Sequence, residues 1–351
     1  MLLEAERTFE VQVQYIGEYG SDHGGVFRDW VLELSRVLFS KELGFFYRDE
    51  SGYTRVSVQT NFLSNDIKYV FLKAAGVLLA IAFRHGLSLG LKFPSLFLES
   101  LCGAPLNVNL FEQVDYEAFH RFNHIGGIRT SKAPPESLQH LRDAVEPRGF
   151  IDSVSVPFGK FIQVNLPHNT DYRGKSDANL TTTVQWREWS RRMLKHRATL
   201  ETAPTQLVDG FRHFVSEPVT TDALRDAFAG VLDLPIDEWR ANTVIINETN
   251  DARSQSVNLF WQAVAQLDAK QKLALLNHWA AMAALPVGGF ANIRASLGKP
   301  LQIFIDDRPC PRLLVAQTCN FLLNIPTTDS LDDMRTSLNL TLKQGLSFGT
   351  A

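Results

Sequence analysis

Cysteine is scarce in this sequence, with three in 351 residues, at Cys102, Cys310 and Cys319. They form neither a CxxC pair nor a recognisable zinc-ligand spacing, and their odd number argues against a disulfide framework. Such usage suits a reducing compartment. We therefore expect a cytoplasmic protein, with a nuclear location as the alternative, and no structural metal.

Long apolar runs and an excess of one charge are also missing. The longest apolar run, Ala74 to Phe83, has ten residues, and a membrane-spanning helix needs about 20. The first residues, Met1 to Arg7, carry charge where a signal peptide has its apolar region. Net charge is −3, so no overall field attracts nucleic acid or an anionic membrane. We expect neither as a partner.

The composition is that of an ordinary globular protein, with 45% hydrophobic and 21% charged residues. The length suffices for one large or two to three moderate domains. Helical periodicity begins at Val26, and a buried helix is expected to break at His85-Gly86 before another starts after Pro94. Residues 301–305 read as a buried strand. Helical and strand patterns thus occur in the same chain.

The stretch around Cys319 combines buried and polar character. Residues 312–316 suit a short strand, Thr318 to Asn320 interrupt the apolar pattern, and residues 321–325 resume it before Pro326. A cysteine in such a notch is presented on a loop between rigid elements, as reactive groups often are. The alternative is a small buried core residue, the commonest role of a cysteine without a disulfide.

Other polar clusters carry weaker signals. His120 and His124 have the i, i+4 spacing of two metal ligands, but Arg121 stands where a zinc-protease motif has glutamate, and no third ligand is recognisable. A solvated surface is the favoured interpretation of the pair. The basic face of the helix predicted from Thr181 is also read as solvated, because the chain is not basic overall. His85 is interpreted as a helix-end residue.

Residues 247–254 are polar and lack apolar periodicity, which is typical of an exposed linker. They divide the chain into a domain of residues 1–247, a hinge at 248–254 and a domain of residues 255–351.

Several separated motifs resemble the catalytic domain of the HECT ubiquitin ligases, in the family's order and over nearly the whole chain. They are Gly24-Gly25-Val26 with Arg28, Leu43 to Phe46, His85-Gly86, Ile236 to Asn242, Leu285 to Phe290, Thr318-Cys319 and Phe348, which is fourth from the end.

The resemblance implies a bilobal α+β fold. Residues 1–247 would form a mainly helical N-terminal lobe, with a small subdomain at about 150–203 that binds the ubiquitin-conjugating enzyme. A small α/β C-terminal lobe at 255–351 would carry the cysteine loop. The implied partners are a conjugating enzyme charged with ubiquitin, ubiquitin itself and a protein substrate.

The family's chemistry maps onto individual residues. By resemblance Cys319 accepts ubiquitin as a thioester and passes it to a substrate lysine, supported by Thr318, Gln317 and Asn320, and Phe348 helps to position the C-terminal lobe. This chemistry implies no ATP, metal or organic cofactor on the protein. Cys310, between two prolines, and Cys102, on an apolar helix face, are weaker candidates for the nucleophile.

Three residues of the predicted subdomain are candidates for binding the conjugating enzyme: Trp186, Trp189 and Met193. Aromatic residues are favoured at interface centres. The alternative is that the two tryptophans belong to a core. The family's segment is shortened here.

The chain departs from the family pattern at three places. Gln317 replaces the usual histidine, Asn320-Phe321 reverses the usual order, and residues 277–285 lack a Thr-Gly-containing segment that ends in arginine. The third departure leaves open a degenerate module that binds ubiquitin or a conjugating enzyme without catalysis. An unrelated cysteine hydrolase is the third interpretation, and it would need a histidine and an Asp or Asn at Cys319.

The family usually takes its substrates through segments N-terminal to the catalytic domain. We therefore expect either a fragment of a longer ligase or a ligase with an unusual targeting arrangement.

Overall fold

The computed structural model describes Val13 and residues 25–57, 64–127, 183–247, 250–308 and 310–347. The chain divides into two compact units, one made of residues up to Phe93 together with those from Pro204 onwards, the other of Pro94–Ala203. Helices dominate both units, and a four-stranded sheet belongs to the first, which confirms the expected α+β class.

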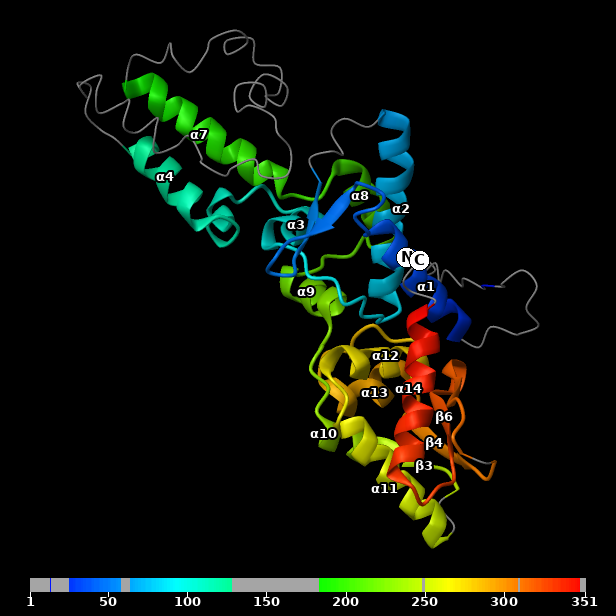
Figure 1. Ribbon diagram of the computed structural model, residues 1–351. Helices are drawn as coiled ribbons and strands as arrows, with labels where there is room; N and C mark the ends of the chain where they lie inside the picture. The colour runs from blue at the N-terminus through cyan, green and yellow to red at the C-terminus, as the bar shows by residue number, and fades with distance from the viewer. Residues whose placement is uncertain are drawn as a thin grey trace. The chain divides into compact units, whose positions relative to one another are not determined.

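The N-terminal part of the first unit contains the long helix α2 (Figure 1), which is buried in its second half, from Leu78 to Ala82. The side chain of Ser64 caps its first turn by accepting a hydrogen bond from the backbone N–H of Ile67. The helix ends before His85, and Gly86 follows with φ of 63°, which confirms the predicted break. The elements of this part are α1 (Gly25–Leu38), β1 (Phe46–Arg48), β2 (Thr54–Val56), α2 (Asn65–Arg84), α8 (Thr205–Phe214) and α9 (Thr221–Ala229).

Helices α2 and α8 cross through glycines. A Cβ placed on Gly76 of α2 would collide with the backbone carbonyl of Leu207, and one on Gly210 of α8 would collide with that of Lys73. The two backbones therefore approach more closely than any side chain would allow. This crossing explains why the apolar pattern of α2 contains a glycine in its middle.

The C-terminal part of the first unit contains a mixed sheet of order β3-β4-β6-β5. Strand β4 is parallel to both β3 and β6, and β5 is antiparallel to β6. Ile303 and Ile305 of β4 and Leu323 of β6 point into a core shared with α11, α12 and α14. The elements are α10 (Ile236–Ala241), β3 (Thr243–Ile245), α11 (Asp251–Ala265), α12 (Ala269–Ala280), η5 (Gly289–Asn292), α13 (Ile293–Leu297), β4 (Leu301–Asp306), β5 (Val315–Gln317), η6 (Thr318–Asn320), β6 (Leu322–Pro326) and α14 (Leu331–Ser347).

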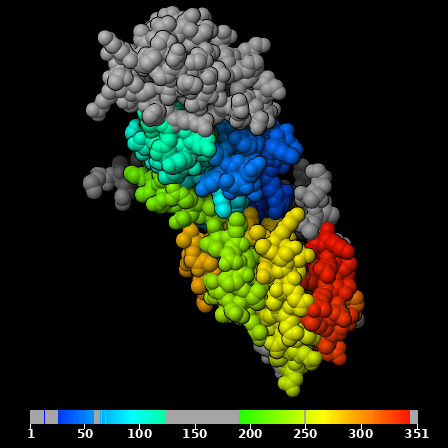
Figure 2. Space-filling model, turned by 60° about the vertical axis from the view of Figure 1, so that its left-hand side comes forward, coloured from blue at the N-terminus to red at the C-terminus, as the bar shows by residue number. Residues whose placement is uncertain are grey.

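An aromatic cluster fills the centre of this core. The ring of Trp239, from α10, stacks on Phe290 at a centroid distance of 4.9 Å and lies 6.0 Å from Trp261 and 5.9 Å from Trp279. All four side chains are buried. Figure 2 shows the yellow surface of α11 between the red surface of α14 and the yellow-green segment that includes α10. Residues before the predicted hinge thus share a core with residues after it.

The predicted hinge at 248–254 is not simply an exposed linker. Helix α11 begins at Asp251, and the Asn250 side chain caps it by accepting a hydrogen bond from the Arg253 backbone. The Asn247 amide pairs with both backbone groups of Ile305, at 2.8 Å in each direction. Residues that cap a helix and extend a sheet have the same polar composition as a linker, so composition alone does not distinguish the two.

The second unit holds α3 (Ser95–Leu101), η2 (Val108–Gln113), α4 (Tyr116–Gly127) and α7 (Thr183–Leu200). Helices α4 and α7 pack side by side (Figure 1), and Ser190 of α7 donates a hydrogen bond to the carbonyl of Phe122 in α4. Most of the predicted subdomain at 150–203 lies outside the described residues, except α7 and the turn after it. Across the described ranges, no helix combines the length and apolar character that a membrane span requires.

Candidate functional site: the cysteine loop

Cys319 lies at the turn of a β-hairpin. Strand β5 pairs with β6 so that Gln317 faces Leu322, and the 3-10 turn η6 with Phe321 closes the gap between them. The sequence correctly placed the polar turn, but the first strand starts at Val315 rather than at 312. The backbone N–H groups of Arg312 and Leu314 bind side-chain hydroxyls of α14 instead of a neighbouring strand.

The chain leaves the turn through Phe321, a non-glycine residue with φ of 53°. This left-handed conformation is disfavoured for a side chain with a Cβ, yet the ring is only 1% exposed. The guanidinium of Arg28, from α1, lies over that ring, 4.4 Å from its centroid. Burial and this cation–π contact oppose the backbone strain and fix the point where β6 begins.

Cys319 is half-buried, between exposed Gln317 and Asn320 and beside half-buried Thr318. Cys319 therefore keeps some contact with solvent, which argues against a fully buried core residue. Within the described contacts, no side chain of these three neighbours is hydrogen-bonded to the Cys319 sulfur. Their expected supporting role remains a prediction.

Four side chains hold the turn through its backbone carbonyls, and we refer to Arg28, Lys299, Gln302 and Trp279 as the loop-holding residues. Arg28 Nη2 donates to the carbonyl oxygen of Thr318 at 2.6 Å. Lys299 Nζ donates to that of Cys319 at 3.1 Å.

The next two carbonyls are held in the same way. Gln302 Nε2 donates to the carbonyl oxygen of Asn320 at 3.2 Å, and Trp279 Nε1 donates to that of Phe321 at 2.7 Å. The Phe321 carbonyl also accepts the Gln302 backbone N–H at 2.8 Å. Four successive peptide planes are thus oriented by donors from α1, α12 and the start of β4, which leaves the cysteine little backbone freedom.

The segment that departs from the family pattern, residues 277–285, contacts this hairpin directly. Trp279 binds Phe321 as described, and His278 Nε2 lies 3.1 Å from the carbonyl oxygen of Leu314. Burial lowers the pKa of His278, and its hydrogen bond to Leu314 opposes that effect. A neutral ring with its Nε2 proton directed at Leu314 satisfies both conditions.

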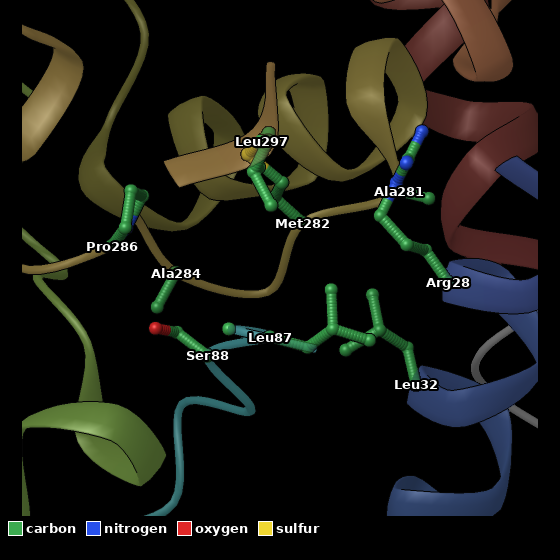
Figure 3. Close-up of a pocket in the computed structure, with 10 residues that line it drawn as sticks. Arg28, Leu32, Leu87, Ser88, Ala281, Met282, Ala284, Pro286 and Leu297 are labelled. Atoms are coloured by element: carbon green, nitrogen blue, oxygen red, sulfur yellow. The ribbon is translucent and has the colours of Figure 1, made fainter. Parts of the chain in front are cut away.

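The end of the same segment lines a narrow, mostly apolar pocket (Figure 3). Ala281 lies beside Arg28 of α1 at one end of the pocket, and Ala284 lies opposite Ser88, from the segment after α2, at the other end. Leu32 of α1, Leu87 and Met282 also line it. Ala281 ends α12 in the left-handed region, with φ of 49°. The altered segment therefore packs against the helix that provides Arg28.

The side chains of the other predicted site residues lie outside the described structure. Trp186, Trp189 and Met193 fall within α7, whose side chains at these three positions lie outside the described part. Phe348 also lies outside it.

The remaining cysteines and histidines occupy separate places. Cys310 Sγ lies 3.2 Å from the hydroxyl of Ser337, and Cys102 ends α3. His120 is exposed and bonds Glu112 at 2.8 Å. Among the residues that the structure describes, no group of three or more potential ligands could hold a metal ion.

Sequence reasoning missed the loop-holding residues as a set. Arg28 was noticed only as part of a motif, and nothing in the spacing of Lys299, Gln302 and Trp279 links them to Cys319. The proximity of Lys299 and Gln302 to the turn depends on the parallel pairing of β4 with β6, which local patterns do not encode.

Comparison with known proteins places the chain in a family. A model of the HECT-domain (ubiquitin-transferase) family matches residues 32–351. The chain therefore belongs to the HECT-domain family, as its sequence motifs suggested.

Named relatives support the same assignment. The chain is 24% identical to E3 ubiquitin-protein ligase TOM1 of Saccharomyces cerevisiae over 349 residues, 97% of this chain and 10% of that protein. It is 24% identical to human E3 ubiquitin-protein ligase NEDD4 over 96% of this chain and 24% of that protein. Human E3 ubiquitin-protein ligase HECW1 is 27% identical over 97% of this chain and 20% of that protein. The chain thus spans between a tenth and a quarter of the length of these three relatives.

Proposed function

We propose that this chain is the catalytic part of a ubiquitin ligase, in which Cys319 carries ubiquitin as a thioester between a conjugating enzyme and a substrate lysine. One observation carries the proposal. In a chain of the HECT-domain family, a half-buried cysteine sits at a hairpin turn whose four carbonyls are all held by donors.

The first step exchanges one thioester for another. The Cys319 thiolate attacks the carbonyl carbon of ubiquitin's terminal glycine, and the conjugating enzyme's cysteine leaves as a thiolate. Bond types are conserved, so the step is nearly balanced in free energy. The fixed turn lowers the entropic cost of bringing the sulfur to the carbonyl.

The second step is downhill because an amide replaces a thioester. A substrate lysine amine attacks the same carbonyl, the C–S bond breaks, and Cys319 is regenerated. The amine loses its proton to solvent or a nearby base. Neither step needs a redox change or an added energy source on this protein.

The decisive experiment follows the thioester. The chain is mixed with ubiquitin and a panel of charged conjugating enzymes, and products are run on gels without reducing agent. We expect a ubiquitin adduct that a thiol reagent removes, and that is lost in Cys319→Ala. In Cys319→Ser the adduct should survive the thiol reagent, because an oxyester replaces the thioester.

Cys310→Ser provides the matched control, since Cys310 is also half-buried and lies on the same side of the sequence hinge. It should retain the adduct. An adduct that depended on Cys310 instead would contradict the assignment of the nucleophile.

We further propose that α7 forms part of the site for the conjugating enzyme, through Trp186, Trp189 and Met193. A helix that carries two tryptophans and a methionine among arginines suits an interface centre. Trp189→Ala should raise the concentration of charged conjugating enzyme needed for half-maximal loading of Cys319. An unchanged concentration dependence would favour a core role.

The second candidate function is a non-catalytic module, and residues 277–285 are the observation that favours it. It predicts binding of ubiquitin or a conjugating enzyme without an adduct. The same gels, combined with a binding measurement, separate the two candidates. A cysteine hydrolase is less well supported, because in the described structure no histidine is hydrogen-bonded to the Cys319 sulfur.

The proposed chemistry also sets the expected location. Charged conjugating enzymes act inside cells, so we propose a cytoplasmic or nuclear protein. Its three cysteines form no disulfide within the described residues, which suits these compartments.

A further inference from the structure

The second unit contains a pocket at the place where three of its segments meet. They are helix α3, the loop of residues 104–107 that follows it, and the end of α7 with the turn after it. The Ala203 backbone N–H donates to Oγ of Ser100 at 2.8 Å, which ties that turn to α3. The pocket has a volume of about 200 Å³. A cavity of about 150 Å³ holds a benzene-sized group, and pockets for drug-sized ligands begin at about 300 Å³, so this one suits a single side chain.

The apolar part of the lining comes from α3 and from the loop after it. Leu96 is buried and Leu106 is half-buried, whereas Ala104 and Pro105 are exposed. The pocket is therefore reached from the surface, and its apolar residues can contact the aliphatic stem of a long side chain.

Glu99 supplies the charge of the pocket. Leu96, Glu99 and Ser100 share one face of α3, because they are spaced i, i+3 and i+4. Glu99 is half-buried, and within the described structure its carboxylate has neither a hydrogen bond nor an ion pair. No lysine or arginine is among the described residues that line the pocket. A carboxylate partly withdrawn from water without a cation is unfavourable, and a positively charged ligand would relieve that cost.

The hydroxyl groups of the lining already donate their protons to backbone carbonyl oxygens. The three bonds run from Ser100 to Phe97 at 2.7 Å, from Thr199 to Lys195 at 2.8 Å and from Thr202 to Thr199 at 2.7 Å. A hydroxyl has one proton and two lone pairs, so these three groups offer a ligand only acceptors. Asn107 uses its Oδ1 to accept the Asn109 N–H, and its amide nitrogen is the side-chain donor that remains among the described lining residues.

We propose that this pocket binds an arginine side chain of a partner protein. A guanidinium has five N–H donors and no acceptor, which matches a carboxylate surrounded by hydroxyl lone pairs. Its planar fork can bond both oxygens of Glu99 at once. It is also more weakly hydrated than a lysine ammonium, so it enters a partly apolar pocket at a lower cost. The site does not depend on the thioester, because none of its residues takes part in the chemistry of Cys319.

The experiment titrates a capped alanine-arginine-alanine peptide into the full chain, whose leucine and threonine methyl groups are labelled for NMR. We expect the methyl signals of Leu96, Leu106, Thr199 and Thr202 to shift. The same peptide with citrulline has the shape of arginine without its charge. It should bind about tenfold more weakly or less, because its bond to Glu99 is no longer between two charged groups. The lysine peptide should also bind more weakly than the arginine peptide.

Three variants define the result. Glu99→Gln keeps the size of the side chain and should weaken binding of the arginine peptide by about tenfold or more. Glu112→Gln removes the same charge and should leave binding unchanged, because Glu112 is also half-buried in this unit but bonds His120 and is not a lining residue. Ala104→Leu should narrow the pocket and weaken binding without any change of charge, and its exposed position makes it the variant that decides if Glu99→Gln does not fold.

Four outcomes would overturn the inference: no methyl shifts, equal binding of the arginine and citrulline peptides, equal effects of Glu99→Gln and Glu112→Gln, or full binding by Ala104→Leu. None of these measurements involves ubiquitin or Cys319. Failure of this site therefore leaves the proposed function intact, and failure to form the thioester leaves this site intact.

Discussion

At the scale of single residues, Arg28 connects the cysteine turn to a helix almost three hundred positions earlier in the chain. It combines a hydrogen bond to Thr318 with a cation–π contact to Phe321. A hydrogen bond from a charged donor contributes about 1.5 to 3 kcal/mol, enough to change a rate by about tenfold or more.

Arg28→Met should therefore slow loading of Cys319 by about tenfold, because the turn loses one of its four donors. The loading rate of Arg28→Lys should lie between those of the unmodified chain and Arg28→Met, since lysine keeps the charge but not the planar stacking group. The rate of adduct formation measures both. Arg36, on the same helix and paired with Glu33, is the control position, and an equal effect of Arg36→Met would show general damage to α1 instead.

His278 gives the protein a pH-dependent stability. Burial lowers its pKa in the folded state below the ordinary value of 6.5. The unfolded chain then binds more protons than the folded chain between those two values, so the free energy of unfolding falls as pH drops below about 6.5.

His278→Gln should flatten this dependence, because glutamine can still donate to Leu314 but does not titrate. Thermal unfolding midpoints of the variant and the unmodified chain, measured from pH 7.5 to 5.5, test this prediction. Burial also lowers the pKa of His85 and His196. The unfolding midpoint of the variant should therefore still depend on pH, but less steeply than that of the unmodified chain. A slope identical to that of the unmodified chain would refute the role of His278.

At the scale of elements, the crossing of α2 and α8 leaves no room for a side chain at Gly76 or Gly210. Gly76→Ala should lower the free energy of unfolding by about 2 kcal/mol or more, because a methyl group must force two helices apart. Alanine is the better helix former, so propensity alone predicts the opposite sign.

Denaturant unfolding distinguishes these effects. The control is Ala74→Gly at an exposed position of the same helix, where only intrinsic propensity, about 1 kcal/mol, is at stake. If Gly76→Ala were as stable as the native chain, the close approach of the two helices would be wrong.

The elements also show how far the sequence could be read. Helices with strong periodicity were predictable, including the break at His85. A glycine inside a helix is a weaker guide, since α14 continues past Gly345 to Ser347. One glycine costs a helix only about 1 kcal/mol, which packing readily outweighs.

The turn that contains Cys319 was predictable from a polar interruption between apolar runs, but the residues that surround the turn were not. Three of the four loop-holding residues come from α12 and the start of β4, and one comes from α1. Pairings between distant segments depend on tertiary packing, which no local pattern records.

At the scale of the whole molecule, the contacts argue for a pivot earlier than the predicted hinge. Leu234 and Trp239 belong to the core of the C-terminal sheet, and β3 pairs with β4. The ion pair of Arg253 with Asp307 further ties the predicted hinge to that sheet. We propose that any swing of the C-terminal lobe occurs between α9 and α10.

Two truncated chains test this placement. A chain of residues 233–351 should unfold cooperatively, because it keeps Trp239, β3 and the start of α11. A chain of residues 255–351 should unfold at a markedly lower temperature or fail to fold, because Phe290, Trp261 and Trp279 lose their contacts with Trp239. Equal midpoints for the two would restore the boundary at 248–254.

Because the four donors around the turn originate in segments scattered along the chain, the reactivity of one thiol reports on all of them. The rate at which a small electrophile alkylates Cys319 would change if α1, α12 or the start of β4 were perturbed, and the measurement needs no ubiquitin. The same sulfur that is proposed to carry the cargo is thus a built-in probe of whether the surrounding architecture is intact.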